Sequence, residues 1–482
     1  MEKVKNWRRL CISAVQVGVL GLSGCSFTPA YEQPALPVSQ TYPADSPTAD
    51  SPSAPRVASL VWRDYFVDPT LQSLIGEALA NNKDLRVLIA RVDEARIMYG
   101  VRRAEQLPTV GIGAANARLA LPGEISPTGT DALINQYVAG FNLGSWELDF
   151  WGRVRDLKDA ALMDYLATDA ARQAATVSLI AQVADAYLVL RETDERIQIA
   201  TQTVHSRQQS TDMFKRRVEV GATSRLELVQ SETLLTQAQG LEAQLRQARA
   251  AQAHGLSLLT GTQATLVTDG MPSIDQMVLG ELQVGMPSLL LTQRPDIVAA
   301  ESKLRAANAN IGAARAAFFP RVSLMGAYGG LSLELNSLFE PSSRAWLFSP
   351  SISMPIFDGG RTQANVDLSE VRKNIAISNY EKTIQVAFRE VSDALSARYW
   401  LTGQVAIARQ ALAAQTERAR LTKLRYDNGA ASYFEVMDAQ RDLLNVQQQF
   451  VQVRRALLSS RVGLYAALGG GVQLGIEDGK DQ

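Results

Sequence analysis

The chain has 482 residues, enough for two to four domains of ordinary size. Lys and Arg number 48 against 49 Asp and Glu, so the formal net charge of −1 argues against a nucleic-acid-binding protein, which normally carries a basic surface. With two Cys and two His, the sequence has almost no material for a Cys/His zinc site, a disulfide framework or a nucleophile–His pair. We therefore expect no enzyme, no metal site and no bound cofactor.

The first 24 residues have the composition of a secretory leader. Basic residues within 3–9 precede an apolar run from Leu10 to Leu22, which is shorter than a membrane-spanning helix. The run leads into Leu22-Ser23-Gly24-Cys25, which resembles a bacterial lipobox. We expect residues 1–24 to be removed and Cys25 to carry a diacylglycerol and an N-acyl chain. A chance cysteine among small residues is the alternative, but the basic start, the apolar run and the box occur in the order of a lipoprotein leader.

The residues after the leader indicate an anchored tether. Ser26, rather than Asp, follows the acceptor cysteine, which in such lipoproteins favours export to the outer membrane of a Gram-negative bacterium. We expect a lipid-anchored, extended segment over 25–64. Its stretch from Pro43 to Pro55 is rich in Pro, Ser and Ala, a composition typical of extended linkers.

The body of the chain is a duplicated unit. A shift of 208 residues matches the chain from Gly152 onward with its second half, and a shift of 212 does so upstream of Pro108. The matched pairs include Gly152 with Gly360, Asp185 with Asp393, Gly221 with Gly429, Glu227 with Glu435, and Pro108 with Pro320. We expect a first repeat over 65–261, a connector over 262–290, a second repeat over 291–469 and a tail over 470–482.

Each repeat contains two segments with the period-2 alternation of β-strands. The first repeat predicts strands at about 109–119 and 137–150, and the second predicts strands at about 322–331 and 346–357. In the last of these, large apolar side chains fall on one face and serines on the other. The segments between paired strands are polar and rich in turn residues, as exposed hairpin loops are.

A very long helix, a turn and a return helix follow each pair of strands. Neither 153–220 nor 361–428 contains a Pro, and their apolar residues recur about every 3.5 residues. At a rise of about 1.5 Å per residue, each long helix would span ~100 Å. The return helices are expected over 222–261 and 430–468. An ordinary coiled coil has the same periodicity and stays an alternative.

The strands bear on the oligomeric state. Their length suits the ~9–11 tilted residues with which a β-strand crosses a bilayer. An open sheet in lipid would expose unpaired edge groups, and the smallest membrane barrels have about eight strands. If the strands insert, the protein must therefore be an oligomer, with eight strands from two chains or twelve from three. The alternative is a soluble hairpin packed on the helices.

Three stretches resemble the signatures of a known family. The run Trp146-Glu147-Leu148-Asp149-Phe150-Trp151-Gly152-Arg153 is similar to the strand-to-helix junction of outer membrane factors, the TolC-like exit ducts of tripartite efflux pumps. Gln293-Arg294-Pro295-Asp296-Ile297 and Ala313-Ala314-Arg315-Ala316-Ala317-Phe318-Phe319-Pro320 resemble two further signatures. With the lipobox, they indicate the lipoprotein branch of that family, the branch typified by OprM. The resemblance extends from Cys25 to about Gly470.

The resemblance implies a fold class that is mainly α with membrane β. It implies a homotrimer whose twelve-stranded outer-membrane β-barrel continues into a periplasmic α-helical barrel. Such a trimer is a passive, gated duct that carries drugs or other small toxic compounds and performs no catalysis. Its implied partners are a periplasmic adaptor (membrane fusion) protein, an inner-membrane transporter of the resistance-nodulation-division (RND) type and outer membrane lipid.

The resemblance also assigns a periplasmic gate to the second repeat. Asp438 and Arg441 lie at i, i+3 on one helix face, where an ordinary solvated ion pair is the alternative. Tyr426 matches a hydrogen-bonding tie, and Phe434 matches an apolar plug where relatives often carry Leu. The equivalent first-repeat residues lack these charges, so we expect the second helical hairpin to move more; they are Val218, Leu226, Gln230 and Thr233.

The two hairpin tips need glycine for a reversal at positive φ. By resemblance, both tips also contact the adaptor; they are Val220, Gly221 and Ala222 in the first repeat and Asn428, Gly429 and Ala430 in the second.

Two other functions fit part of the sequence. A periplasmic adaptor is also a coiled-coil lipoprotein, but it has one helical hairpin and no such duplication. A duct for type I protein secretion shares the barrel and usually lacks the lipobox. The sequence does not reveal the exported compounds, the cognate adaptor and transporter, the resting diameter of the gate, or whether several pumps share the duct.

Overall fold

The computed structural model describes residues 26–42, 61–126, 129–263, 282, 290 and 294–471. The expected leader, the acylation site Cys25, the tether from Pro43 to Pro55 and most of the connector and tail lie outside these residues. The described chain divides into two compact units. Unit 1 comprises the described residues up to Pro34 with Arg91–Thr168 and Ala299–Tyr380, and unit 2 comprises the remainder.

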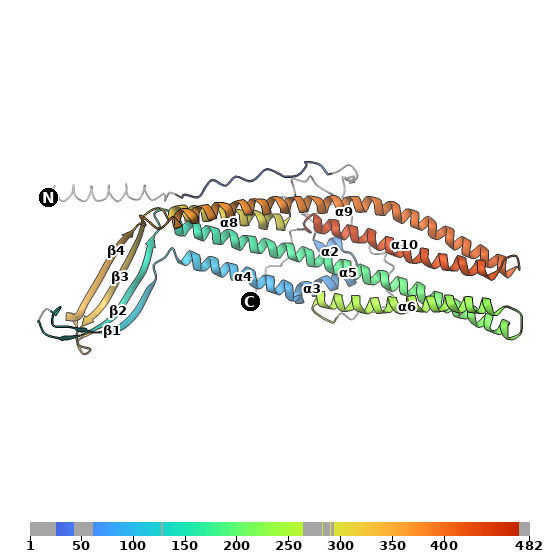
Figure 1. The fold of residues 1–482 in the computed structure, drawn as a ribbon, viewed down its shortest axis with the longest axis horizontal. Coiled ribbons are helices and arrows are strands. Elements are labelled where there is room, and N and C mark those ends of the chain that lie inside the picture. Colours follow the sequence, from blue (N-terminus) through green and yellow to red (C-terminus); the bar gives the residue numbers. More distant parts are fainter. Residues whose placement is uncertain are drawn as a thin grey trace. The chain divides into compact units, whose positions relative to one another are not determined.

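Each half of the described chain has the same order of elements: a helix, two strands, a long helix and a return helix (Figure 1). The first half contains α4 (Lys83–Ala104), β1 (Val110–Leu121), β2 (Ala132–Leu148), α5 (Arg153–Glu219) and α6 (Arg225–Thr260), preceded by α2 (Trp62–Tyr65) and α3 (Pro69–Asn81). The second half contains α8 (Pro295–Ala316), β3 (Arg321–Ser332), the short 3-10 helix η4 (Pro341–Ser343), β4 (Arg344–Ser353), α9 (Arg361–Asp427) and α10 (Tyr433–Ala467). The long helices α5 and α9 have 67 residues each.

Several observed ends differ from the expected ones. β2 begins at Ala132 rather than at 137, because its first residues continue the ladder opposite Leu121. β4 ends at Ser353 rather than at 357, since the partner strand begins at Arg321 and Pro355 has no N–H to donate. The return helices begin at 225 and 433, three residues later than expected, because the residues after each tip glycine complete the turn.

Unit 1 contains one antiparallel sheet with the strand order β1-β2-β3-β4. Residues directly opposite each other on antiparallel strands project from the same face. The register therefore places Ile112, Phe141, Tyr328 and Trp346 in one row across all four strands. Their exposed fractions are 79%, 55%, 58% and 77%. One face of the sheet thus presents a continuous row of large apolar and aromatic side chains.

The other face and the two edges of the sheet have different properties. The opposite face carries the serines of β4, including Ser349 and Ser351. It also contains the pair Gly140 and Gly329, where a Cβ on either residue would overlap the neighbouring strand. Within the described chain, β1 and β4 are edge strands with no partner on their outer sides. The sheet is therefore open and two-sided.

Unit 2 has an apolar core around α2, α3 and α10. Tyr65 stacks on Tyr465 with ring centroids 4.8 Å apart, and Tyr65 Oη donates to Arg461 O at 2.9 Å. Asp68 caps α3 by accepting from the backbone N–H of Thr70. These contacts fix the start of the first repeat against the last helix of the second.

Two described residues of the second expected signature, Arg294 and Asp296, have a structural function in unit 2. Arg294 is 7% exposed, and its Nη1 donates to Glu390 Oε2 at 2.8 Å and to Ala467 O at 2.9 Å. Its other nitrogens bind the carboxylate of Asp296. Arg294 therefore links the start of α8 to α9 and to the end of α10.

One window of 18 residues within α5 is long and apolar enough to cross a membrane by composition alone. Half of that window is buried inside the molecule, as in the core helices of many soluble domains.

Candidate functional site

The two hairpin tips have the same backbone geometry. Gly221 and Gly429 both have φ of +70°, the left-handed conformation that favours glycine at a helix C-terminus. Ala222 N donates to Arg217 O at 2.8 Å, and Ala430 N donates to Arg425 O at the same distance. A Cβ on either glycine would meet nothing within 4 Å. The turn thus requires glycine for its φ alone, and both tips present open space in the described chain.

The helices that leave the tips are capped differently. In the first hairpin, Ser224 and Glu227 form a complete capping box, and a hydrogen bond from Thr223 helps to lower the pKa of Glu227. In the second hairpin, Ser432 makes no side-chain cap. Its Glu435 instead accepts from Arg425 Nη1 at 3.1 Å. The same glutamate position therefore closes a local cap in one repeat and joins two helices in the other.

An apolar cluster lies behind the tips, between the two hairpins. Its buried members are Phe214, Tyr433, Val436 and Met437. The rings of Phe214 and Tyr433 are 4.5 Å apart, and burial raises the pKa of the Tyr433 phenol. Tyr426 packs edge-on against Tyr433 at 5.0 Å. This cluster holds the second hairpin against α5.

Tyr426 also makes a polar contact with the first hairpin. Its Oη accepts a hydrogen bond of 2.6 Å from Arg217 Nη1. Arg217 lies near the end of α5 and Tyr426 near the end of α9. The two residues therefore tie the two hairpins together close to their tips.

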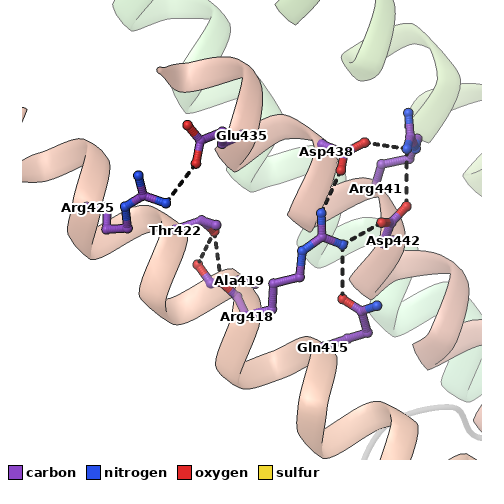
Figure 2. A network of polar contacts seen from close by, with 9 residues as sticks. All are labelled: Gln415, Arg418, Ala419, Thr422, Arg425, Glu435, Asp438, Arg441 and Asp442. Carbon is purple, nitrogen blue, oxygen red and sulfur yellow. Dashed lines mark hydrogen bonds and ion pairs between the residues drawn. The ribbon is translucent and has the colours of Figure 1, made fainter. Parts of the chain in front are cut away.

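Asp438 and Arg441 belong to a network of four charged residues (Figure 2). Arg441 Nη2 donates to Asp438 Oδ1 at 2.5 Å. Arg418 of α9 donates to Asp438 Oδ2 through Nη2 and to Asp442 Oδ2 through Nη1, each at 2.7 Å. Arg441 Nη2 also donates to Asp442 Oδ1 at 3.2 Å. The network therefore joins α9 to α10 on the exposed side of the second hairpin.

The network is electrostatically complementary but close to solvent. Hydrogen bonds from Arg418 hold the pKa of the Asp442 carboxyl below its usual value. The two aspartates in turn raise the pKa of the Arg418 guanidinium, with Asp442 contributing most. The side chains of Arg418 and Arg441 are 42% and 51% exposed, so water and salt screen the pairs. Such exposed contacts contribute little to stability.

Phe434 has a different environment from the other expected gate residues. Its side chain is 61% exposed. It lines a groove of about 190 Å³ between α6 and α10. The groove also contains the expected equivalents Gln230 and Thr233, opposite Asp438 and Arg441. Equivalent positions of the two repeats thus face each other across this groove.

The structure brings the expected gate residues to one end of unit 2, but in two groups. Tyr426 contacts Arg217 and the apolar cluster, whereas Asp438 and Arg441 contact Arg418 and Asp442. Sequence analysis missed these last two residues and Arg217. Counting outward from Gly429 in both directions would have found Arg418, because antiparallel helices place residues at similar distances from a turn side by side.

Comparisons with known proteins agree with this organisation. The family model described as outer membrane efflux protein matches residues 74–262 and 286–470. The solvent efflux pump outer membrane protein SrpC of Pseudomonas putida is 38% identical over 455 residues, which is 94% of this chain and 97% of that protein. The outer membrane protein OprJ of Pseudomonas aeruginosa is 38% identical over 461 residues, 95% of each chain.

Solved structures with the same fold include two bacterial membrane proteins. The open state of the MtrE outer membrane channel of Neisseria gonorrhoeae has a TM-score of 0.85 and 34% identity, covering 93% of this chain and 99% of that one. A membrane protein from Pseudomonas aeruginosa has a TM-score of 0.86 and 37% identity, covering 93% and 98%.

Proposed function

We propose, on the premise that this chain belongs to the outer membrane efflux protein family, that it forms the exit duct of an RND-type tripartite efflux pump. The chain is an outer membrane efflux component. Relatives are named for the efflux of solvents, toluene and antibiotics. The exported compounds proposed here are accordingly small toxic molecules, which the duct passes without a cofactor and without catalysis.

One observation supports the duct above all: an open four-stranded sheet with an exposed aromatic row and two free edges. Such a sheet is unstable in lipid, because each unpaired backbone group costs several kcal/mol there. Pairing the β4 edge of one copy with the β1 edge of the next removes every edge. Three copies would give a twelve-stranded barrel with the aromatic row facing lipid, and the long helices would continue it as an α-helical barrel in the periplasm.

The gate is proposed at the hairpin ends of unit 2. Three copies of the network around Asp438 and Arg441, with Phe434 beside it and Tyr426 tied to Arg217, would form a ring of restraints. The first hairpin is fastened by buried contacts such as Thr211 with Ser231, whose hydroxyls are 2.7 Å apart. Within the second hairpin, α9 is joined to α10 by exposed ion pairs, while the buried cluster around Tyr433 packs α10 on α5. This inequality supports the second hairpin as the moving part.

The tips and the N-terminus complete the proposal. The tips at 220–222 and 428–430 would contact a periplasmic adaptor, whose helical hairpins they can approach closely because their glycines leave open space. An inner-membrane RND transporter would supply the energy. Acylation at Cys25 would anchor the chain in the outer membrane of a Gram-negative cell.

The test is single-channel conductance in planar bilayers. Purified wild type is compared with Asp438→Ala/Arg441→Ala and with the control Glu417→Ala/Arg420→Ala, which removes an exposed i,i+3 pair of α9 that lies outside the network. Small or rare wild-type steps that grow only in the first variant support a gated duct. Large, identical steps in all three proteins reject the gate. Folded oligomers that never conduct reject the duct.

A further inference from the structure

The segment 26–33 lies along one stripe of α8 in unit 1, where Figure 1 draws it in dark blue beside that helix. The stripe consists of Glu301, Arg305, Asn308 and Gly312. These residues recur every three or four positions and therefore share one helix face. Each contacts a residue of the segment or makes room for one.

The polar part of the stripe holds the middle of the segment. Tyr31 Oη donates to Glu301 Oε1 at 3.1 Å, and the guanidinium of Arg305 lies 4.7 Å from the centre of the Tyr31 ring. Asn308 is 3% exposed, and its Nδ2 donates to Pro29 O at 2.7 Å. A buried amide that serves a carbonyl of the segment indicates a built site rather than a surface contact.

The glycine of the stripe makes room for the start of the segment. A Cβ at Gly312 would overlap both Thr28 and the carboxylate of Asp156. Asp156, in the first turn of α5, is 3% exposed and accepts from Ser26 Oγ at 3.1 Å. Burial raises the pKa of this carboxyl, and the neighbouring hydroxyls of Thr28 and Ser26 oppose that rise. The segment therefore supplies a hydrogen-bond donor, the Ser26 hydroxyl, to a buried acid.

Phe27 extends the contact to the end of the sheet. Its ring stacks on Phe319 at 4.4 Å, and Phe319 lies 5.0 Å from Trp151. Trp151 Nε1 donates to Pro320 O at 2.8 Å, which joins the β2–α5 junction to the α8–β3 junction. The N-terminal end of the docked segment therefore lies at the junctions between the helices and the strands.

We propose that the α8 stripe and Asp156 form a docking groove for the segment that follows the acylated cysteine, and that this docking holds the lipid level with the ends of the strands. The inference rests on the proposed acylation of Cys25 in an outer-membrane duct. Undocked, residues 26–60 could extend ~100 Å, so the lipid could enter the membrane far from the sheet. When the segment is docked, Ser26 is held on Asp156, so the Cα atom of the acylated residue must lie within ~3.8 Å of a fixed position. Docking thereby raises the effective concentration of the lipid beside the strands, and this couples lipid insertion to strand insertion.

The duplication supplies a matched control. The shift of 212 residues places Gly100 of α4 on Gly312 of α8. A Cβ on Gly100 meets nothing within 4 Å. Gly100→Val and Gly312→Val therefore make the same chemical change within a helix, but only the second enters the groove.

The first measurement is hydrogen–deuterium exchange of residues 26–33 in the full-length protein in lipid nanodiscs. Wild type is compared with Ser26→Ala/Tyr31→Phe, Gly312→Val, Gly100→Val and a lipid-free Cys25→Ser chain exported behind a non-lipoprotein leader. We expect slow exchange in wild type, Gly100→Val and Cys25→Ser, and exchange about tenfold faster or more in the other two. Fast exchange in wild type, or exchange as slow as in wild type in both Ser26→Ala/Tyr31→Phe and Gly312→Val, would overturn the proposal. Ser26→Ala/Tyr31→Phe leaves the helices intact, so it stays informative if Gly312→Val misfolds.

The second measurement is a double-mutant cycle on the yield of heat-resistant oligomers in outer membranes. If docking acts through the lipid, Ser26→Ala/Tyr31→Phe and Cys25→Ser lower the yield by similar factors, and their combination is no worse than either alone. If the combined variant instead lowers the yield by the product of the two single factors, the segment and the lipid act independently. That result would overturn the coupling. A chain that assembles normally yet never restores drug resistance would count against the proposed efflux function and leave the docking groove standing.

Discussion

Arg217 Nη1 donates a hydrogen bond of 2.6 Å to Tyr426 Oη across 209 residues of sequence. The counterpart of Arg217 in the duplicated unit is Arg425, which binds Glu435 of its own hairpin instead. The same arginine position therefore links the two hairpins in the first repeat and closes one hairpin in the second. The duplicated unit has thus diverged at the end where we place the gate.

The Arg217–Tyr426 tie is expected to restrain opening. Tyr426→Phe keeps the ring against Tyr433 but removes the acceptor oxygen, so the closed state loses about 1 kcal/mol per protomer. We expect a several-fold higher open probability in planar bilayers and greater entry of vancomycin into cells. Arg217→Leu should match it, because both variants remove the same bond. Wild-type gating in either variant would exclude the tie from the gate.

Arg418 is expected to matter as much as the two gate residues that the sequence indicated. It holds both Asp438 and Asp442, so Arg418→Ala leaves two neighbouring carboxylates with Arg441 alone. We expect Arg418→Ala to raise the open probability at least as much as Arg441→Ala. Because these pairs are exposed, molar salt should weaken them in wild type and have little further effect in Arg418→Ala. The control Glu417→Ala/Arg420→Ala should respond to salt as wild type does.

Much of the helical architecture was predictable from the sequence, because its signals are local. Pro-free apolar periodicity indicated α5 and α9 to within one residue at the ends that precede Gly221 and Gly429. The strand ends were less predictable. β2 is longer than expected because pairing with β1, a tertiary interaction, extends it to Ala132.

The candidate site was predictable only in part. Asp438 and Arg441 were found because they share a helix face within one turn. Arg418 and Arg217 contact the site from other helices, so their participation depends on how hairpins pack. The docking of Tyr31 on Glu301 has no local signal at all, since 270 residues separate the two.

Acid should open the duct through Asp442. The pKa of Asp442 is lowered in the closed state, so the ionised carboxylate stabilises that state at pH values above the usual aspartate pKa of 3.8. This stabilisation of the closed state is lost as the pH falls through its lower pKa. We expect constant open probability between about pH 7 and 5 and a rise below about pH 4. In Arg418→Ala the pKa of Asp442 should return toward its usual value in both states, so the acid-induced rise through this carboxyl should shrink. An acid-induced rise of undiminished size in Arg418→Ala would mean that other groups titrate in the gate.

The hairpin tips should separate assembly from coupling to the pump. Gly221→Trp and Gly429→Trp put a large side chain into open space and strain a backbone at φ of +70° by about 1–2 kcal/mol each. We expect oligomers to form while drug resistance falls to the level of cells that lack the protein. Gly403→Trp is the control, because Gly403 is an exposed glycine within α9 with nothing near its Cβ position. Full resistance in both tip variants would remove the tips from the adaptor interface.

The aromatic row should face lipid, and a charge there should cost more than a charge on the other side of the same strand. Trp346 and Ser349 lie on β4, three residues apart, and project from opposite faces of the sheet. Trp346→Arg would place a cation on the lipid-facing side, at a cost that reaches about 2–4 kcal/mol per protomer at the bilayer midplane and falls toward the interfaces, whereas Ser349→Arg would face the water-filled lumen. We expect a marked loss of heat-resistant oligomers from the outer membrane for Trp346→Arg alone. Ser349→Arg should assemble and instead change the ion selectivity of the conducting steps. The reverse pattern would mean that the sheet is inserted with its aromatic row inward, and equal tolerance of both would mean that the strands do not lie in lipid.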